Sequence, residues 1–204
     1  MRWFGEKSAE RLSLIFSAPS IAFMAVLIFT LFSPIGTGPV LTQTASILLG
    51  TLFLSVLPVA PIAYYASKGI IDRDITDRKK RPRFFAMSLI GYSLGAVTFG
   101  LLNATSMMVL SLAYIFVTLS VALISLFWKV SVHTTGIAGP VTGLTYVFGW
   151  VVTPLYLLLL PVGWARLKLR AHTPAQLVVG VIVAFLVTFL VYRVFYPSPP
   201  SSPL

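Results

Sequence analysis

Long apolar stretches separated by short polar segments run through almost the whole chain. Charged residues are missing from the stretches 12–67, 84–128, 130–165 and 171–192. A helix that crosses about 30 Å of hydrocarbon needs about 20 apolar residues, because each backbone amide must be satisfied within its own segment. The shortest stretch therefore predicts one membrane-spanning helix, and each of the two longest predicts two.

Polar turns at 33–39 and 103–106 divide the two longest stretches. The stretch 130–165 holds either one helix and a loop, or two shortened helices that break at 148–154, where Gly and Pro interrupt the pattern. Two such helices of about 16 residues would reach only about 24 Å. With both counted, we predict seven segments: 12–33, 45–66, 84–103, 106–128, 134–149, 151–167 and 174–195.

These segments predict an all-α fold, a polytopic integral membrane helical bundle with about six or seven transmembrane segments. We expect a single domain over 1–196, followed by a disordered tail at 197–204 that is too rich in Pro and Ser to pack. The composition agrees, because 57% hydrophobic and 10% charged residues exclude an ordinary soluble domain.

The charges gather on one predicted face of the membrane. If 130–165 holds two helices, each pair of crossings returns the chain to the same side, and every charged cluster except Arg193 lies there. The positive-inside rule then makes that face and the N-terminus cytoplasmic. With one helix, the cluster 166–170 would lie opposite Arg81. Attraction to anionic lipid is sufficient to explain the net charge of +10, so we do not expect nucleic acid as a partner.

Three clusters of ionisable residues at predicted membrane boundaries are candidates for a functional site: 72–83, 129–135 and 165–176. Each also has a structural interpretation, as a solvated loop, a helix start with a structural histidine, or an interfacial anchor. The functional interpretation is an anion site, because arginine suits phosphate and histidine suits nucleophilic and acid–base chemistry. The two histidines, His133 and His172, reach one face only if 130–165 holds two helices.

Three pieces of these clusters follow one another in a fixed order: Arg81-Pro82, Ser131-x-His133 and Arg166-x5-His172. In order and spacing they resemble the motifs K-x6-R-P, P-S-G-H and S-R-x5-H-x3-D of the type 2 phosphatidic acid phosphatase superfamily. The resemblance covers 72–180. That family places two helices between its motif histidines, which favours two helices in 130–165.

The resemblance implies a membrane lipid phosphatase that uses no metal and no other cofactor. His172 would attack the phosphate and form a phosphohistidine, and His133 would protonate the leaving oxygen. Arg81 and Arg166 would stabilise the equatorial oxygens as charge builds there. Ser131 would add a hydrogen bond to the phosphate.

The sequence also departs from these motifs. Asp74 stands where the first motif has lysine, so the missing cation is expected from Lys79, Lys80 or Arg83, or is absent. Of these we assign Lys80 and Arg83 to the phosphate site. Valine replaces Pro and Gly of the second motif, and alanine replaces Ser of the third, at Val130, Val132 and Ala165.

The remaining departure concerns the residue that orients the nucleophile. Gln176 stands where the third motif has Asp. A glutamine carbonyl can accept a hydrogen bond from the imidazole of His172 and hold its tautomer. It cannot offset the positive charge that develops on the ring, so slower catalysis is expected.

A site at the bilayer surface would select lipids whose phosphate lies at headgroup level. An isoprenoid phosphate or diphosphate is favoured, because a cytoplasmic site reaches newly made prenyl diphosphates, and a phosphatidate-like lipid also fits. One alternative is a weakened or inactive protein that binds lipid phosphates. Another is a polytopic prenyltransferase, suggested by the acidic run 72–77, but its Mg²⁺ chemistry needs a second acidic cluster, and the only other acids are Glu6 and Glu10.

Overall fold

The computed structural model describes residues 2–72 and 74–197, with the backbone alone described for 2–4. The described residues form helices joined by turns and short loops, with no strand. This confirms the predicted all-α helical bundle. Most of the predicted tail, 198–204, lies outside the described residues. The α-helices are α1 Arg2–Ile15, α2 Ala18–Phe32, α3 Gln43–Gly50, α4 Leu57–Ser67, α5 Arg81–Leu101, α6 Thr105–Ser125, α7 Val132–Phe148, α8 Leu159–Lys168 and α9 Pro174–Phe195.

Three shorter helical pieces join these elements. A π-helical turn, Thr51–Val56, links α3 to α4 without a break, just before Pro58, which has no amide hydrogen to donate. A 3₁₀ turn, Arg78–Lys80, leads into α5, and a longer 3₁₀ piece, Gly149–Leu158, joins α7 to α8. Each piece lies where proline, glycine or a capping residue disturbs the regular α-helical pattern.

Five continuous helical stretches in the described part of the chain are long and apolar enough to cross a membrane. A sixth results if the bent pair Gly5–Ile15 and Ala18–Phe32, which meet at 41°, is one span. The predicted first segment, 12–33, therefore begins earlier and contains a bend, next to Pro19 at the start of α2. The five stretches are Gln43–Ser67, Arg78–Leu101, Thr105–Ser125, Val132–Lys168 and Pro174–Phe195.

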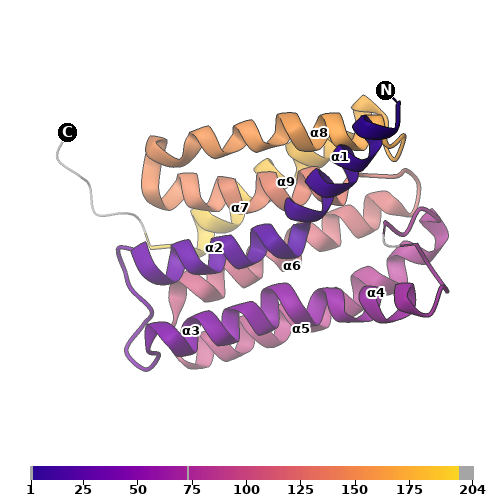
Figure 1. Cartoon of the computed structure of the whole chain (residues 1–204). Helices are drawn as coiled ribbons and strands as arrows, with labels where there is room; N and C mark the ends of the chain where they lie inside the picture. The colour runs from indigo at the N-terminus through magenta and orange to yellow at the C-terminus, as the bar shows by residue number, and fades with distance from the viewer. Residues whose placement is uncertain (1, 73, 198–204) are drawn as a thin grey trace.

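The stretch Val132–Lys168 is folded back on itself. Gly149 has φ 72° and ψ −156°, a conformation that favours glycine, and it ends α7. After this turn the hydroxyl of Tyr156 lies 2.7 Å from that of Thr142, which a straight helix would place about 21 Å away. Figure 1 shows α7 and α8 side by side, and the two helices are in contact. The two-helix alternative for 130–165 is therefore the one that the chain adopts.

Close helix packing holds the bundle together. Rings of Phe29 on α2 and Tyr192 on α9 stack at 6.1 Å in the core, and both side chains are fully buried. Small residues let neighbouring helices approach, as membrane bundles require in the absence of a strong hydrophobic driving force between them. At Gly180 of α9, an added Cβ would lie 2.7 Å from Thr134 Oγ1 and 2.9 Å from the Ser131 carbonyl. This contact fixes the start of α9 against the start of α7.

One end of the bundle gathers three loops and the N-terminal helix. The α4–α5 loop, the α6–α7 loop and the α8–α9 loop lie together with α1 at the right of Figure 1. Hydrogen bonds join them, because Arg81 donates to the Val130 carbonyl and Lys129 donates to the Ala171 carbonyl. The three clusters singled out in the sequence therefore meet at one end of the molecule.

Candidate functional site

Arg81 is the first residue of α5 and its side chain is 3% exposed. Its guanidinium donates to three backbone carbonyls, at 2.9 Å to Ile75, 2.8 Å to Val130 and 3.3 Å to Asp74. A buried arginine needs such partners, because an unpaired buried charge is strongly unfavourable. Arg81 therefore holds the α4–α5 loop and the α6–α7 loop together at the site.

Arg166 lies in the last turn of α8 and is 2% exposed. One terminal nitrogen lies 2.9 Å from a carboxylate oxygen of Asp74, and the other donates to the Ser13 hydroxyl at 3.4 Å. Its Nε is buried and has no hydrogen-bond partner in the described part of the chain. Arg166 is thus an incompletely satisfied cation whose main partner is an internal carboxylate.

Asp74 stays ionised beside this arginine. Partial burial raises the pKa of its carboxyl, but the hydrogen bond from Arg166 and the charge of that guanidinium outweigh burial, so the pKa lies below its ordinary value. The Asp74 side chain keeps 37% of its surface exposed. A carboxylate therefore occupies a position on Arg166 that a phosphate oxygen would also fit.

His172 lies in the loop before α9 and is buried. Its Nδ1 is 3.1 Å from Oε1 of Gln176, and the Thr173 amide donates to the same oxygen at 3.2 Å. Gln176 and Thr173 form a capping box at the start of α9, which locks the glutamine in place. Because Oε1 can only accept, Nδ1 carries the proton and the neutral ring has its lone pair on Nε2.

The surroundings of His172 favour that neutral form. Burial lowers the pKa of the imidazole to about 3, and the charges of Lys129, Arg166 and Arg81 act in the same direction, against the opposite effect of the Gln176 hydrogen bond. Near neutral pH the ring is therefore uncharged. An uncharged, oriented imidazole is the form that can act as a nucleophile.

His133 and Ser131 lie at the start of α7. Ser131 is the N-cap and is fully buried, and its hydroxyl accepts a hydrogen bond from the Thr134 amide at 3.4 Å. Its own amide donates to the Gln176 carbonyl at 3.2 Å, which ties α7 to α9. His133 is half-buried, and the charges of Arg166 and Asp74 act on it together with the Ser13 backbone. Both histidines thus share the neighbourhood of Arg166.

Lys129 is a member of the site that the sequence did not single out as a phosphate ligand. Its Nζ donates to the Ala171 carbonyl at 2.8 Å, one residue before His172. Burial lowers the pKa of this ammonium, and the charges of Arg81 and Arg166 lower it further. The available signal was its place at the head of the cluster 129–135, four residues before His133.

The side chains of Lys80 and Arg83 have other partners in the structure, which differs from their predicted place in the phosphate site. The Lys80 ammonium donates to the Ile70 carbonyl at 3.3 Å, and Arg83 donates to the Tyr65 hydroxyl at 2.8 Å and lies over its ring. The physical reason for Arg83 is helical geometry, since residues two apart on a helix point about 200° apart. With Arg81 turned toward the site, Arg83 faces α4.

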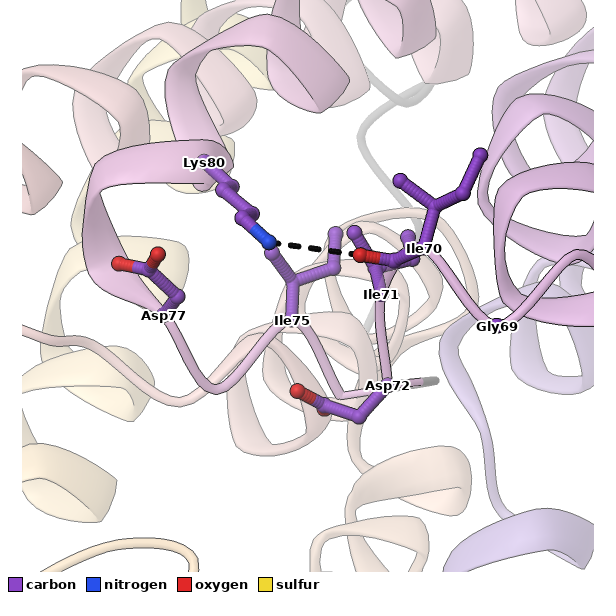
Figure 2. Close-up of a pocket in the computed structure, with 7 residues that line it drawn as sticks. All are labelled: Gly69, Ile70, Ile71, Asp72, Ile75, Asp77 and Lys80. Carbon is purple, nitrogen blue, oxygen red and sulfur yellow. Dashed lines mark hydrogen bonds between the residues drawn. The ribbon is translucent and has the colours of Figure 1, made fainter.

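A polar cavity of about 170 Å³ lies beside this cluster, within the α4–α5 loop. Figure 2 shows Lys80 reaching across it to the Ile70 carbonyl. The cavity adjoins the site through Ile75, whose carbonyl accepts from Arg81, and through Asp72, whose carboxylate accepts from the Asp74 amide; neither histidine is among its lining residues. Its walls are Gly69, Ile70, Ile71, Asp72, Ile75, Asp77 and Lys80.

A smaller, mostly apolar cavity of about 60 Å³ lies against the first turns of α7. Val132 and Thr135, which flank His133 on α7, contribute to its wall, together with Tyr114 of α6 and Thr188 of α9. In the described part of the chain, no group of three or more His, Asp and Glu side chains is placed to hold a metal ion. Asp72, for example, uses its carboxylate to accept hydrogen bonds from the amides of Asp74 and Thr76.

Comparison with protein families, with curated proteins and with solved structures finds nothing that matches this chain. The residues at the loop-bearing end of the bundle and their contacts therefore carry the functional conclusion.

Proposed function

We propose that this chain is a membrane hydrolase that removes phosphate from a lipid-linked phosphate or diphosphate through a phosphohistidine on His172. The observation that carries the proposal is the placement of that histidine: its Nδ1 lies 3.1 Å from Oε1 of Gln176, and the charges of Arg81, Arg166 and Lys129 act on its ring and favour the neutral form. An oriented nucleophile beside several cations is the arrangement that phosphoryl transfer needs.

In the first step, Nε2 of His172 attacks phosphorus and the bond from phosphorus to the lipid oxygen breaks. His133 gives its proton to that oxygen, so the lipid leaves as an alcohol, or as a monophosphate when the substrate is a diphosphate. In the second step, water gives a proton to His133 and attacks the phosphohistidine, which releases inorganic phosphate and restores His172. Arg81 and Arg166 stabilise the negative charge on the transferring group in both steps.

Gln176 sets the expected speed of this reaction. Its oxygen fixes the tautomer of His172, as the aspartate of the resembling family would, but it is uncharged. The positive charge that develops on the ring during attack is therefore less stabilised, and turnover is expected to be slow.

The substrate that we propose is an isoprenoid phosphate or diphosphate, with a phosphatidate-like lipid as the second choice. Support comes from the position of the site, at one end of helices that are long and apolar enough to span a membrane. A phosphate at headgroup level would meet the arginines while its hydrocarbon chain stays among the helices or in lipid. By the positive-inside rule we place this end and the N-terminus on the cytoplasmic side.

The second candidate function is lipid-phosphate binding without catalysis. The Asp74–Arg166 ion pair favours it, because a substrate phosphate would have to displace an internal carboxylate before Arg166 could contact it. A protein of this kind would bind lipid phosphates weakly and release no phosphate.

Phosphate release from purified protein in detergent tests the proposal. Prenyl phosphates, prenyl diphosphates and phosphatidate are supplied with EDTA present, and wild type is compared with His172→Ala and His133→Ala. We expect slow release by wild type, none above background by His172→Ala, and a loss of about 100-fold or more in His133→Ala. Arg83→Ala is the matched control, since this exposed arginine lies against Tyr65, and it should leave the rate unchanged.

Two results would contradict the proposal. Unchanged phosphate release by His172→Ala would exclude a phosphohistidine intermediate on His172. Binding of the lipids by wild type without any release would favour the second candidate, the non-catalytic binder.

A further inference from the structure

The first-motif position of the resembling family carries a cation, and in this chain that position carries the opposite charge. The carboxylate of Asp74 lies 2.9 Å from the guanidinium of Arg166. The backbone carbonyl of Asp74 accepts a hydrogen bond from Arg81 at 3.3 Å. Of the cations that follow it, Arg78 donates to the Leu126 carbonyl and Lys80 donates to the Ile70 carbonyl. A phosphate at His172 would therefore lack one of the cations expected around it, unless another segment supplies it.

The α6–α7 loop supplies such a cation. Lys129 Nζ is 2.8 Å from the Ala171 carbonyl, and Ala171 directly precedes His172. Among the described residues, no carboxylate forms an ion pair with this ammonium. One of its three N–H groups is used by the carbonyl, so two others remain for a ligand.

Neighbouring hydrogen bonds hold the backbone around Lys129 in place. The carbonyl of Val130 accepts from Arg81 at 2.8 Å, and the amide of Ser131 donates to the Gln176 carbonyl at 3.2 Å. The segment that carries Lys129 is thus tied both to a phosphate-site arginine and to the residue that orients His172. Its side chain is half-buried, which leaves it accessible to a ligand at the membrane surface.

We propose that Lys129 binds the substrate phosphate beside His172 and replaces the lysine that the first motif lacks. This inference rests on the proposed function. The ammonium donates to an equatorial phosphate oxygen and keeps the ring of His172 uncharged before attack. A charge-assisted hydrogen bond to a phosphoryl group that gains charge in the transition state changes the rate by about 10- to 100-fold.

The test compares Lys129→Met with Lys129→Arg. Methionine keeps the length of the side chain without its charge, so we expect kcat/KM for lipid-phosphate hydrolysis to fall by about 10- to 100-fold. Arginine keeps the charge and should retain activity within about fivefold of wild type. Lys80→Met, which removes a lysine that donates to the Ile70 carbonyl, is the matched control and should not change kcat/KM.

The pH profile separates phosphate binding from a merely structural role. Removal of the Lys129 charge should make His172 easier to protonate, so the acid limb of the activity profile should move to higher pH in Lys129→Met and stay in place in Lys129→Arg. Equal kcat/KM in wild type and Lys129→Met would overturn the inference. So would an equal loss in the methionine and arginine variants with no shift of the acid limb.

Binding of orthovanadate, a phosphate analogue, distinguishes failure of this inference from failure of the proposed function. If wild type hydrolyses no lipid phosphate, hydrolysis at His172 is wrong, and calorimetry with vanadate then decides the role of Lys129. Binding that weakens about tenfold or more in Lys129→Met supports a phosphate ligand. Equal binding by both proteins, or no binding by wild type, overturns it.

Discussion

The carboxylate of Asp74 lies 2.9 Å from the guanidinium of Arg166, so an internal anion sits on the arginine that the sequence assigns to substrate phosphate. The sequence showed only that a lysine was missing at position 74. The structure adds that Asp74, which stands in place of that lysine, forms an ion pair with Arg166, a residue of the candidate site. Under the proposed function, a substrate phosphate and Asp74 would therefore compete for Arg166.

Asp74→Ala should make the protein less stable and bind phosphate better. Loss of the carboxylate leaves Arg166 buried without its ion-pair partner, which we expect to cost about 1–3 kcal/mol, below the range for a fully buried pair because Asp74 is partly exposed. Phosphate should then replace the lost anion. Thermal unfolding in detergent, with and without inorganic phosphate, measures both effects.

The outcome depends on how much phosphate raises the unfolding temperature. A larger rise in Asp74→Ala than in wild type is expected, because bound ligand stabilises the folded state in proportion to its occupancy. Glu10→Ala, which removes an exposed carboxylate of α1, should show the wild-type rise. If phosphate stabilised wild type and Asp74→Ala equally, competition for Arg166 would be excluded.

Gln176→Asp should increase the rate of phosphate release. A carboxylate at this position accepts from Nδ1 of His172, as the amide oxygen does, and also offsets the charge that develops on the ring. We expect a gain of about tenfold in kcat, measured by single-turnover and steady-state phosphate release. The pKa of His172 should rise as well, because a nearby anion favours imidazolium.

Gln176→Ala is the matched variant for this position. It removes the acceptor of His172 and one half of the capping box with Thr173, which costs about 1 kcal/mol of stability. Activity should fall below wild type even where the protein is fully folded. A rate in Gln176→Ala equal to that of wild type would show that the amide does not orient the nucleophile.

Acid should destabilise the folded protein through His172. Its pKa is lowered from 6.5 to about 3, so the unfolded chain takes up a proton on this residue at a higher pH than the folded protein does. Stability supported by the neutral ring is complete above about pH 6.5 and is lost as the pH falls from there toward 3. The unfolding temperature should therefore fall more steeply between pH 7.5 and 4 in wild type than in His172→Asn. Parallel curves for the two proteins would contradict a buried, neutral His172.

The helices followed from the sequence because their cause is local. Each uncharged stretch is long enough to satisfy its own amides, and the structure places helices at 43–67 and 105–125 close to the predicted 45–66 and 106–128. The interruption at Gly149 was visible in the same way, as a residue that ends a helix. The bend between α1 and α2 was missed. The segment was predicted from its uncharged part, which begins at residue 12, so the charged turns of α1 before it were not counted as helix.

The composition of the site was less predictable, because side-chain direction depends on tertiary contacts. The motif spacing selected His172 and Gln176 as neighbours, and they are in contact because the capping box at the start of α9 turns the Gln176 side chain back toward the residues before the helix. The partners of Arg81 and Arg166 come from segments far along the chain, and no local pattern gives them. Lys129 was missed for this reason: its hydrogen bond to the carbonyl of Ala171, the residue before His172, joins positions 42 residues apart.

Gly180→Ala should disturb the site without changing either histidine or either buried arginine. An added Cβ would lie 2.9 Å from the backbone carbonyl of Ser131, closer than packed atoms allow, so the start of α9 must move away from α7. That shift displaces His172 and Gln176, on the α9 side, from His133 and Arg81. We expect a loss of about 1–3 kcal/mol of stability and at least a tenfold loss of phosphate release.

Gly163→Ala is the control that tests this explanation. Gly163 lies within α8, near Arg166, and an added Cβ would meet only Leu177 Cδ1 at 3.8 Å, an ordinary contact. The same chemical change should therefore leave activity intact and stabilise the helix slightly, because alanine restricts the unfolded chain more than glycine does. Equal activity in the two variants would mean that the close approach of α7 and α9 does not position the site, whereas a loss confined to Gly180→Ala would tie catalysis to that contact.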